Sequence, residues 1–553
     1  MAGSAGAQYL NPGPDSSTTP IRLIGDDDSF PEASVSSLAG TPSISSDGQV
    51  VARASTTFFD FTNFETVRTD RFYGGDPASP GVVLAEGTGT TTTTALGSGR
   101  LNAAGQLGYS AKLSTGAQFE PDGIFLDDTL LVAESTAVPL SAGVNTGAQF
   151  DDGTSGLRFV DIAEDGDVFF LGTFTTSETL TGSAPGSPLD GRTGAVIDQA
   201  IFRYDSQTGD YSTLLKSGDT LTNPIGSDLV LGPAEIQPSG SSDLDIQPLG
   251  AVRVSDSGSN YITEVDVDPN INIQINLDPD PSVAEPNGIT RGLVLNNSFL
   301  TTSAGTLIQD DEVYANEVGG GGDPVRIRDL GSFDVNDSGD YAVVIEIGNP
   351  EFQNDGDDPD YSELLLINGQ EVFRNLSPSE SITSVTINNQ GDVAFIYDES
   401  IIVNGNTVLA PGDSTDNGSL FDLTGGIALS DRDANESATL ALQARTNVTG
   451  GTNRAFFTME LDWPSVLLGD YNGDGEVNAA DYTVWADNFG SMVDLEADGN
   501  GNGVIDAADY TVWADNFGNT LPGQAAVTFI PEPATAGLIA LGGLVMLRRP
   551  RSA

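Results

Sequence analysis

The feature that most constrains the fold is a glycine-centred turn that recurs six times between residues 40 and 445. An apolar side chain lies four residues before each turn glycine, and another lies four residues after it. The residues that follow the turn alternate between polar and apolar, a pattern typical of a half-buried β-strand. Each unit therefore predicts a tight turn that leads into a strand. The turn glycines are Gly48, Gly105, Gly166, Gly258, Gly339 and Gly391.

The spacing of these turns favours a repeat architecture. Neighbouring turn glycines lie between 52 and 92 residues apart, and a degenerate seventh unit lies at residues 427–442. Repeats of this size, built from short strands, predict a mainly β protein with a β-propeller of six or seven blades over residues 31–461. A flexible segment, residues 1–30, would precede it. A pair of β-sandwiches or a solenoid is the alternative. The runs at 335–343 and 387–395 resemble repeats of bacterial surface proteins with propeller-like folds.

A second feature is a duplicated segment near the end of the chain. Residues 479–490 recur letter for letter as 507–518, and each copy overlaps a twelve-residue loop rich in Asp, Asn and Gly. Calcium takes about six to eight oxygen ligands, which an EF-hand-type loop supplies from positions 1, 3, 5, 7, 9 and 12 around a glycine at position 6. Both loops fill every position, with backbone carbonyls from Glu476 and Val504. The expected ligands are Asp470, Asn472, Asp474, Glu476, Asn478 and Asp481, then Asp498, Asn500, Asn502, Val504, Asp506 and Asp509.

The segment after each loop predicts a helix. In the first copy Tyr482, Trp485 and Phe489 recur at i, i+3 and i+7, which places them on one helical face, and the second copy repeats them. Gly490 and Gly518 stand where the C-terminus of a helix favours glycine. The predicted module is therefore a small pair of loop–helix units.

Two such units, 28 residues apart and each ending in aspartate, resemble a type I dockerin over residues 466–520. The resemblance implies two bound Ca²⁺ ions and a role in polysaccharide-degrading assemblies, where dockerins dock onto cohesin modules. Positions 10 and 11 of the loops are Ala479-Ala480 and Ala507-Ala508, where cohesin binders commonly carry hydroxyl groups. The expected partner of the module is therefore a cohesin-like or another protein.

Composition excludes several classes of function. The chain has 80 acidic and 21 basic residues, a formal charge of −59, so nucleic acid is not an expected partner. It has no Cys and no His, which excludes a Ser–His–Asp triad, a cysteine nucleophile and zinc bound by histidine or thiolate. Neither lysine, Lys112 or Lys216, lies in a Walker loop. A pair of carboxylates could still hydrolyse glycosides, but no pair is distinguished. We expect that the chain is not an enzyme.

The C-terminal segment, residues 531–553, predicts a sorting signal after a linker at 521–530. Its fourteen uncharged residues, 534–547, would form a helix of about 21 Å, shorter than the roughly 30 Å of a bilayer core. The order of elements resembles a PEP-CTERM signal, which implies processing by an exosortase-type enzyme and membrane contact only through this segment. The flanking residues are Pro531, Glu532 and Pro533 before the apolar run and Arg548, Arg549 and Arg551 after it.

Together these features predict a secreted, calcium-binding protein of the cell surface or the exterior, with a transient or retained C-terminal membrane anchor. Its propeller would act as a binding or scaffold body, with polysaccharide as one possible ligand. The alternative is a component of an extracellular polysaccharide-degrading assembly, either a dockerin-borne enzyme or an accessory subunit. A third interpretation is a purely structural component of an envelope or matrix.

Overall fold

The computed structural model divides the chain into two compact units, Met1–Trp463 and Pro464–Ala553. Each is described by itself. The predicted linker at 521–530, the C-terminal apolar helix and the sorting signal lie outside the described residues. The structure describes residues 11, 13–14, 16–26, 34–60, 62, 65–75, 82–87, 93–113, 121–144, 147–151, 156–181, 193–231, 235–238, 244–245, 249–266, 291–310, 312–315, 325–348, 361–375, 380–449, 451–463, 467–493, 495–500 and 503–519.

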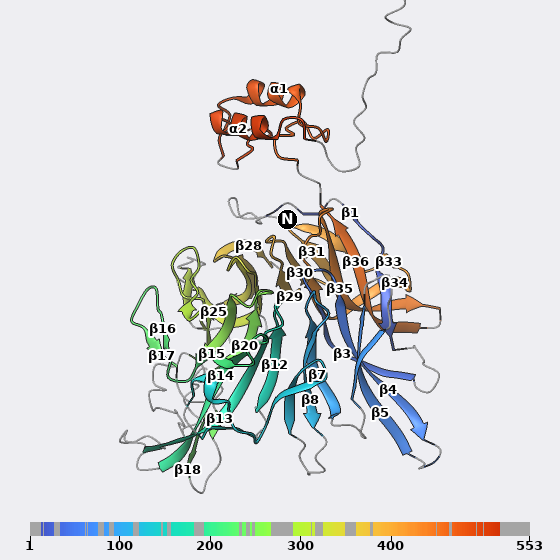
Figure 1. Ribbon diagram of the computed structural model, residues 1–553. Helices are drawn as coiled ribbons and strands as arrows, with labels where there is room; N and C mark the ends of the chain where they lie inside the picture. Colours follow the sequence, from blue (N-terminus) through green and yellow to red (C-terminus); the bar gives the residue numbers. More distant parts are fainter. Residues whose placement is uncertain are drawn as a thin grey trace, which may run out of the picture. The chain divides into compact units, whose positions relative to one another are not determined.

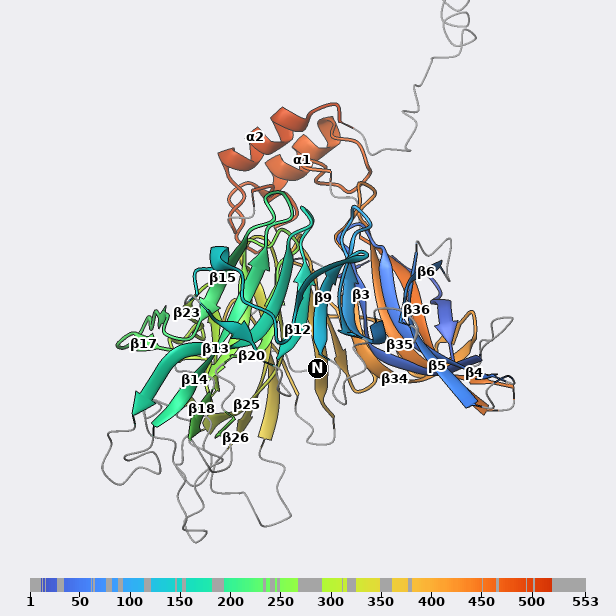
Figure 2. The same cartoon turned by 60° about the horizontal axis from the view of Figure 1, so that its bottom comes forward.

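The first unit is a seven-bladed β-propeller (Figures 1 and 2). Its first three blades are antiparallel sheets whose main strands pair with their neighbours in sequence. Blade one comprises β3 (Ser34–Ile44), β4 (Val50–Asp60), β5 (Glu65–Gly75) and β6 (Val82–Gly87). Blade two comprises β7 (Thr93–Leu101), β8 (Leu107–Leu113), β9 (Asp122–Leu126) and β10 (Thr129–Ala133), followed by the short helix η1 (Leu140–Ala142). Blade three comprises β12 (Leu157–Ile162), β13 (Val168–Thr181), β14 (Thr193–Tyr204) and β15 (Tyr211–Lys216), with β11 (Gln149–Phe150), β18 (Glu235–Pro238) and β19 (Leu244–Asp245) beside them.

Blades four to six repeat this antiparallel plan. Blade four comprises β20 (Leu249–Val254), β21 (Tyr261–Asp266), β22 (Arg291–Leu295) and β23 (Ser298–Phe299), and the hairpin of β16 (Thr220–Leu221) and β17 (Leu229–Val230) precedes it. Blade five comprises β24 (Val313–Ala315), β25 (Val325–Val335), β26 (Tyr341–Gly348), β27 (Tyr361–Ile367) and β28 (Gln370–Arg374). Blade six comprises β29 (Ile382–Ile387), β30 (Val393–Tyr397), β31 (Ser400–Val403) and β32 (Asn406–Leu409).

The seventh blade combines strands from both ends of the propeller unit. β1 (Ser16–Ser17) and β2 (Ile21–Gly25) both pair antiparallel with β36, and Ile24 lies opposite Phe456. The segment 1–30, expected to be flexible and outside the propeller, thus contributes two strands that close the ring. The C-terminal strands of this blade are β33 (Ser414–Thr415), β34 (Gly418–Leu429), β35 (Ser437–Val448) and β36 (Gly451–Asp462).

The glycine-centred turns connect the first and second main strands of blades one to six. All six turn glycines have a left-handed backbone, with φ from 71° at Gly258 to 90° at Gly166. This conformation costs a side chain about 1–2 kcal/mol, which explains why glycine recurs there. In the longer seventh turn Glu436 takes a positive φ of 61°. The degenerate seventh unit expected at 427–442 therefore corresponds to a real blade.

The strands after these turns are buried on both faces, and not on one face as the alternation predicts. In β30, Val393 and Phe395 pack in a core shared with blade five, whereas Ala394 and Ile396 pack in a core shared with blade seven. All four side chains are at most 4% exposed. Each blade lies between two others. Because successive side chains of a strand point to opposite faces, alternate residues pack in two different cores.

The first main strands form a closed ring of contacts, in the order β3, β7, β12, β20, β25, β29 and β34 and back to β3. Asparagines three residues before a turn glycine hold neighbouring turns together. Asn102 donates a side-chain hydrogen bond to the carbonyl of Ala163 at 3.1 Å. Asn336 donates to Asn388 at 3.0 Å, and Asn388 donates to Ser430 at 3.0 Å. These bonds fix the inner strands that surround the central channel.

The second unit contains two helices, α1 (Ala479–Asn488) and α2 (Ala507–Asn516). Asn478 and Asp506 cap their N-termini and form capping boxes with the aspartates at the third helical position. The predicted glycines follow the helices with φ of 88° at Gly490 and 89° at Gly518. Among the described residues, no helix has the length and apolar character needed to cross a membrane.

Candidate functional site

The two predicted calcium loops fold in the same way around their final aspartate. This residue, at position 12, is fully buried in both loops, and its carboxylate accepts backbone N–H groups from positions 3 and 9. In the first loop Asp481 accepts from Asn472 at 3.0 Å and from Asn478 at 2.7 Å. In the second loop Asp509 accepts from the same positions at 3.2 and 2.7 Å. The carboxylate at position 12 therefore points into the loop and not into solvent.

The first aspartate of each loop turns inward as well. The carboxylate of Asp470 accepts the N–H of Gly475 at 2.7 Å, and that of Asp498 accepts the N–H of Gly503 at 2.7 Å. Both glycines stand at position 6, with φ of 83° and 81°. The sharp turn predicted at position 6 is thus present in both loops.

The donor set of the loops matches the oxygen chemistry that Ca²⁺ prefers, because each loop offers carboxylate, amide and carbonyl oxygens. One predicted ligand, Asn502, lies outside the described residues. Within the described ranges, no group of three or more Asp, Glu, His or Cys side chains lies close enough together to hold a metal ion. Binding in these loops would therefore depend on amide and backbone oxygens in addition to carboxylates.

The two loop–helix units interlock through reciprocal hydrogen bonds. The indole of Trp485 donates to the carbonyl of Asp506 at 2.8 Å, and the indole of Trp513 donates to the carbonyl of Asn478 at 2.8 Å. Each tryptophan thus belongs to one unit and contacts position 9 of the other unit's loop. These two hydrogen bonds therefore connect the two candidate calcium sites.

The aromatic stripe of the helices is less buried than a core face. Tyr482 is 43% exposed and Phe489 is 57% exposed, and their counterparts in α2 are similar. The rings contact one another across the two helices, with centroids 5.3 Å apart for Tyr482 and Trp513 and 5.2 Å apart for Trp485 and Tyr510. The expected apolar face is therefore an aromatic surface shared by α1 and α2.

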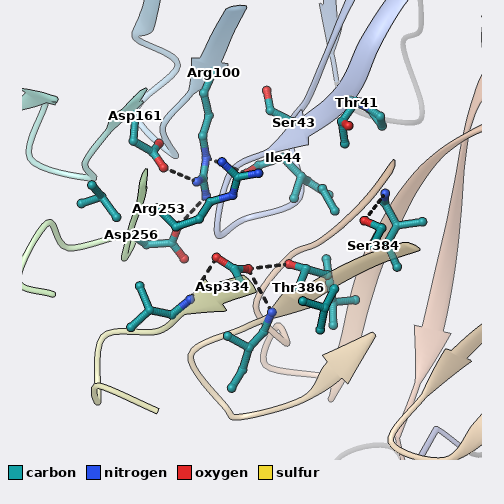
Figure 3. A pocket seen from close by; sticks show the side chains of 18 of the residues that line it. Thr41, Ser43, Ile44, Arg100, Asp161, Arg253, Asp256, Asp334, Ser384 and Thr386 are labelled. Atoms are coloured by element: carbon teal, nitrogen blue, oxygen red, sulfur yellow. Dashed lines mark hydrogen bonds and ion pairs between the residues drawn. The ribbon is translucent and has the colours of Figure 1, made fainter. Parts of the chain in front are cut away.

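The propeller has a cavity of about 240 Å³ in its central channel, lined by residues of the inner strands of all seven blades (Figure 3). Sequence reasoning did not identify this site. Its charged residues come from blades two to five, and hydroxyl side chains come mainly from blades one, two, five and six. The charged lining residues are Arg100, Asp161, Arg253, Asp256 and Asp334, and the hydroxyl-bearing ones are Thr41, Ser43, Ser98, Ser332, Ser384 and Thr386.

Arg100 lies between two carboxylates in this channel. Its guanidinium pairs with Asp161 at 2.8 Å and with Asp256 at 2.6 Å. Burial opposes its charge, but the attraction of the two carboxylates outweighs burial and raises the pKa of Arg100. Burial raises the pKa of Asp161, against the attraction of Arg100. Burial also raises the pKa of Asp256 to about 7, because Arg100 offsets burial only in part and other carboxylates add to the rise.

The other two charged residues, Asp334 and Arg253, differ in the number of hydrogen bonds that they make. Asp334 accepts three hydrogen bonds. Their donors are the hydroxyl of Thr386 at 2.9 Å, the backbone N–H of Ile387 at 3.0 Å and the backbone N–H of Val335 at 3.0 Å. Arg253 donates to the carbonyl of Val252 at 3.1 Å and has no ion pair among the described residues. Its side chain is exposed to the channel.

A sequence signal for this cavity exists in the repeat itself. The residue five positions before each turn glycine lies on the inner strand and lines the cavity, and it is polar or charged in all six units. The apolar residue one position later is buried in every unit, and four of these six residues also border the cavity. These cavity-lining residues are Ser43, Arg100, Asp161, Arg253, Asp334 and Thr386.

No family model matches the chain, and no curated protein matches it. Among solved structures, the β-propeller domain of the Trilobed protease from Pyrococcus furiosus is 10% identical with a TM-score of 0.32, covering 79% of this chain and 96% of that one. The polysaccharide lyase Uly1 is 9% identical with a TM-score of 0.31, covering 82% and 100%. Acylaminoacyl peptidase from Pyrococcus horikoshii is 9% identical with a TM-score of 0.30, covering 75% and 51%.

These similarities carry no argument about activity at such low TM-scores. The propeller assignment depends on the seven blades of the chain itself. Because the neighbours include peptidases and a lyase, they give no support to the expectation that this chain is not an enzyme. That expectation stays a prediction.

Proposed function

We propose that the chain is a secreted, calcium-binding protein of the cell surface or the exterior. Its propeller serves as a binding or scaffold body, and two Ca²⁺ ions order its C-terminal module. The C-terminal segment 531–553 is the sorting signal that an exosortase-type enzyme processes. The segment's sequence supports the sorting step, and the loop geometry supports the calcium step.

One observation carries the calcium proposal: the aspartates that end the two loops are fully buried, in a chain with a formal charge of −59. Asp481 and Asp509 meet only backbone N–H donors in the described contacts. A divalent cation would neutralise this buried charge together with the aspartate at position 1. Since the ion binds the folded loops, its binding free energy stabilises the module.

The alternative, a component of a polysaccharide-degrading assembly, is favoured by the aromatic surface shared by α1 and α2. Exposed aromatic side chains that cluster on one face are typical of docking surfaces. Under this alternative a cohesin-like or other protein binds that face, and the propeller contributes an accessory or catalytic function.

The calcium proposal is tested by titrating the full-length protein with Ca²⁺ in a calorimeter. We expect two tight sites above the weak background of surface carboxylates. The loop variant Asp481→Asn with Asp509→Asn loses them. The matched control Asp487→Asn with Asp515→Asn removes the same charge from exposed positions of α1 and α2 and keeps both sites. Absence of saturable binding in the wild type, or unchanged binding in the loop variant, would contradict the proposal.

The sorting proposal is tested in cells of a host that carries an exosortase. Replacing Pro531, Glu532 and Pro533 with alanine should leave an unprocessed chain in the membrane fraction. Replacing Val527, Thr528 and Phe529 in the linker is the control and should leave processing intact. Equal processing of both variants would contradict this part of the proposal.

A further inference from the structure

Two arginines and three aspartates line the channel cavity, and one of the arginines, Arg253, makes no ion pair in the described part of the chain. Arg100 is matched by Asp161 and Asp256 at 2.8 and 2.6 Å. Asp334 is matched by three hydrogen-bond donors. Arg253 is left with one hydrogen bond, to the carbonyl of Val252, and with no ion pair in the described part of the chain. Figure 3 shows it among the charged side chains that line the cavity.

Arg253 points into a cavity where the nearby carboxylates are bonded to other donors, and Asp161 attracts it without forming an ion pair. A guanidinium has five N–H donors, and Arg253 uses one of its nitrogens for its hydrogen bond to Val252. Its planar fork matches a carboxylate, which can accept two parallel hydrogen bonds. The planar fork of Arg253 therefore offers a binding position for a ligand carboxylate at this point of the lining.

The other polar residues of the cavity lining favour a ligand with hydroxyl groups. Ser332 and Ser384 accept backbone N–H groups of the next blade at 3.1 and 3.3 Å, which leaves their own hydroxyl hydrogens free to donate. The oxygens of Asp334 and of Asp256 can accept from a ligand in addition to their present donors. A cavity of about 240 Å³ is smaller than the roughly 300–1,000 Å³ of sites for drug-sized ligands. It therefore suits a ligand of about the size of one sugar ring.

We propose that the central channel binds a small hydroxylated carboxylate of the sugar-acid class, with Arg253 as the partner of the carboxylate and the channel hydroxyls and Asp334 as partners of the ligand's hydroxyl groups. Arg100 is the fixed element of the site, because its two ion pairs connect blades two, three and four. This binding site lies in the propeller and does not depend on the calcium loops.

The test uses the full-length protein with excess chelator, so that its result is separate from the calcium proposal. Glucuronate is the probe, with glucose as its neutral counterpart and acetate and sulfate as anions without hydroxyl groups on carbon. Binding is measured by calorimetry and by ligand-observed NMR. We expect glucuronate to bind saturably at millimolar concentrations, and each of the other three to bind at least about tenfold more weakly.

Variants locate the site. Arg253→Gln should weaken glucuronate binding about tenfold or more, because a charge-assisted pair is lost. Arg253→Lys keeps the charge but loses the planar fork and should give an intermediate loss. Arg326→Gln, on the same propeller but outside the cavity lining, is the control and should bind like the wild type. Far-UV circular dichroism and the thermal midpoint show that each variant is folded.

Three results would overturn the proposal. The first is no saturable binding of glucuronate by the wild type. The second is unchanged binding in a folded Arg253→Gln variant, which would place the ligand elsewhere. The third is equal binding of sulfate or acetate, which would show a general anion site and refute the recognition of hydroxyl groups.

Discussion

The indole N–H of Trp485 donates a hydrogen bond of 2.8 Å to the carbonyl oxygen of Asp506. These residues belong to different loop–helix units, and Asp506 is both the predicted ligand at position 9 of the second loop and the N-cap of α2. Trp513 makes the same bond to Asn478 in the opposite direction. The helix that follows one loop thus positions a ligand of the other loop, and calcium binding at the two sites should be coupled.

The first prediction concerns this coupling. Trp485→Phe keeps a ring in place but removes the indole donor to the carbonyl of Asp506, at a cost of about 1 kcal/mol. We expect calcium affinity at the second loop to fall about fivefold, measured by calorimetry on the full-length protein. Tyr482→Phe is the control, because the Tyr482 hydroxyl makes no hydrogen bond within the described ranges. Identical titrations of the two variants would contradict the coupling.

A second prediction separates backbone strain from packing at the turn glycines. A side chain at Gly105 would meet no atom closer than 4.0 Å, whereas one at Gly258 would lie 2.6 Å from the ring of Phe169. Gly105→Ala should therefore cost about 1–2 kcal/mol from its φ of 78° alone. Gly258→Ala should cost more, because Phe169 is fully buried and cannot move aside freely. Urea unfolding of both variants measures the difference, and equal costs would refute the packing argument.

A third prediction tests the closure of the ring by the N-terminal strand. Ile24 in β2 is 2% exposed and shares a core with Phe456 of blade seven and Leu38 of blade one. Ile24→Ala should lower the free energy of unfolding by about 2–4 kcal/mol. Ile21→Ala, on the same strand but 43% exposed, should have a much smaller effect. If thermal unfolding midpoints fall equally in both variants, β2 does not act through this core.

The fourth prediction is a pH dependence that arises from Asp256. Its pKa rises from 3.8 to about 7 in the folded protein, so between these values the folded state binds more protons than the unfolded state. Stability from this group is therefore present at low pH and is lost as the pH rises toward 7. The charged groups that face it are Arg100, Asp161, Asp334 and Asp431.

Asp256→Asn cannot ionise, so its urea midpoint should fall less steeply than that of the wild type between about pH 5 and pH 7. Asp210→Asn removes a charge from an exposed position and should keep the wild-type slope. Burial also raises the pKa of Glu134 to about 7, and this residue contributes equally to all three proteins. Parallel curves for Asp256→Asn and the wild type would show that Asp256 ionises normally.

Part of the candidate site could be predicted from the sequence. The calcium loops are local, since twelve consecutive residues set their geometry, and the left-handed conformations of Gly475 and Gly503 agree with the predicted position 6. The channel cavity could not be predicted in this way. Arg100, Asp161 and Asp256 lie on three different blades, and only the packing of these blades brings each carboxylate within 2.8 Å of the guanidinium.

The sequence by itself determined the elements that depend on neighbouring residues: the turn glycines, the strands beside them, the two capped helices and the loop registers. Backbone sterics and short-range hydrogen bonds act over a few residues, so their pattern can be read along the chain. Only the tertiary structure decided the number of blades, the role of residues 16–25 as closing strands, the burial of strands on both faces and the charge balance of the channel. Each of these results from contacts between residues that are hundreds of positions apart or on different blades, and a local pattern does not encode them.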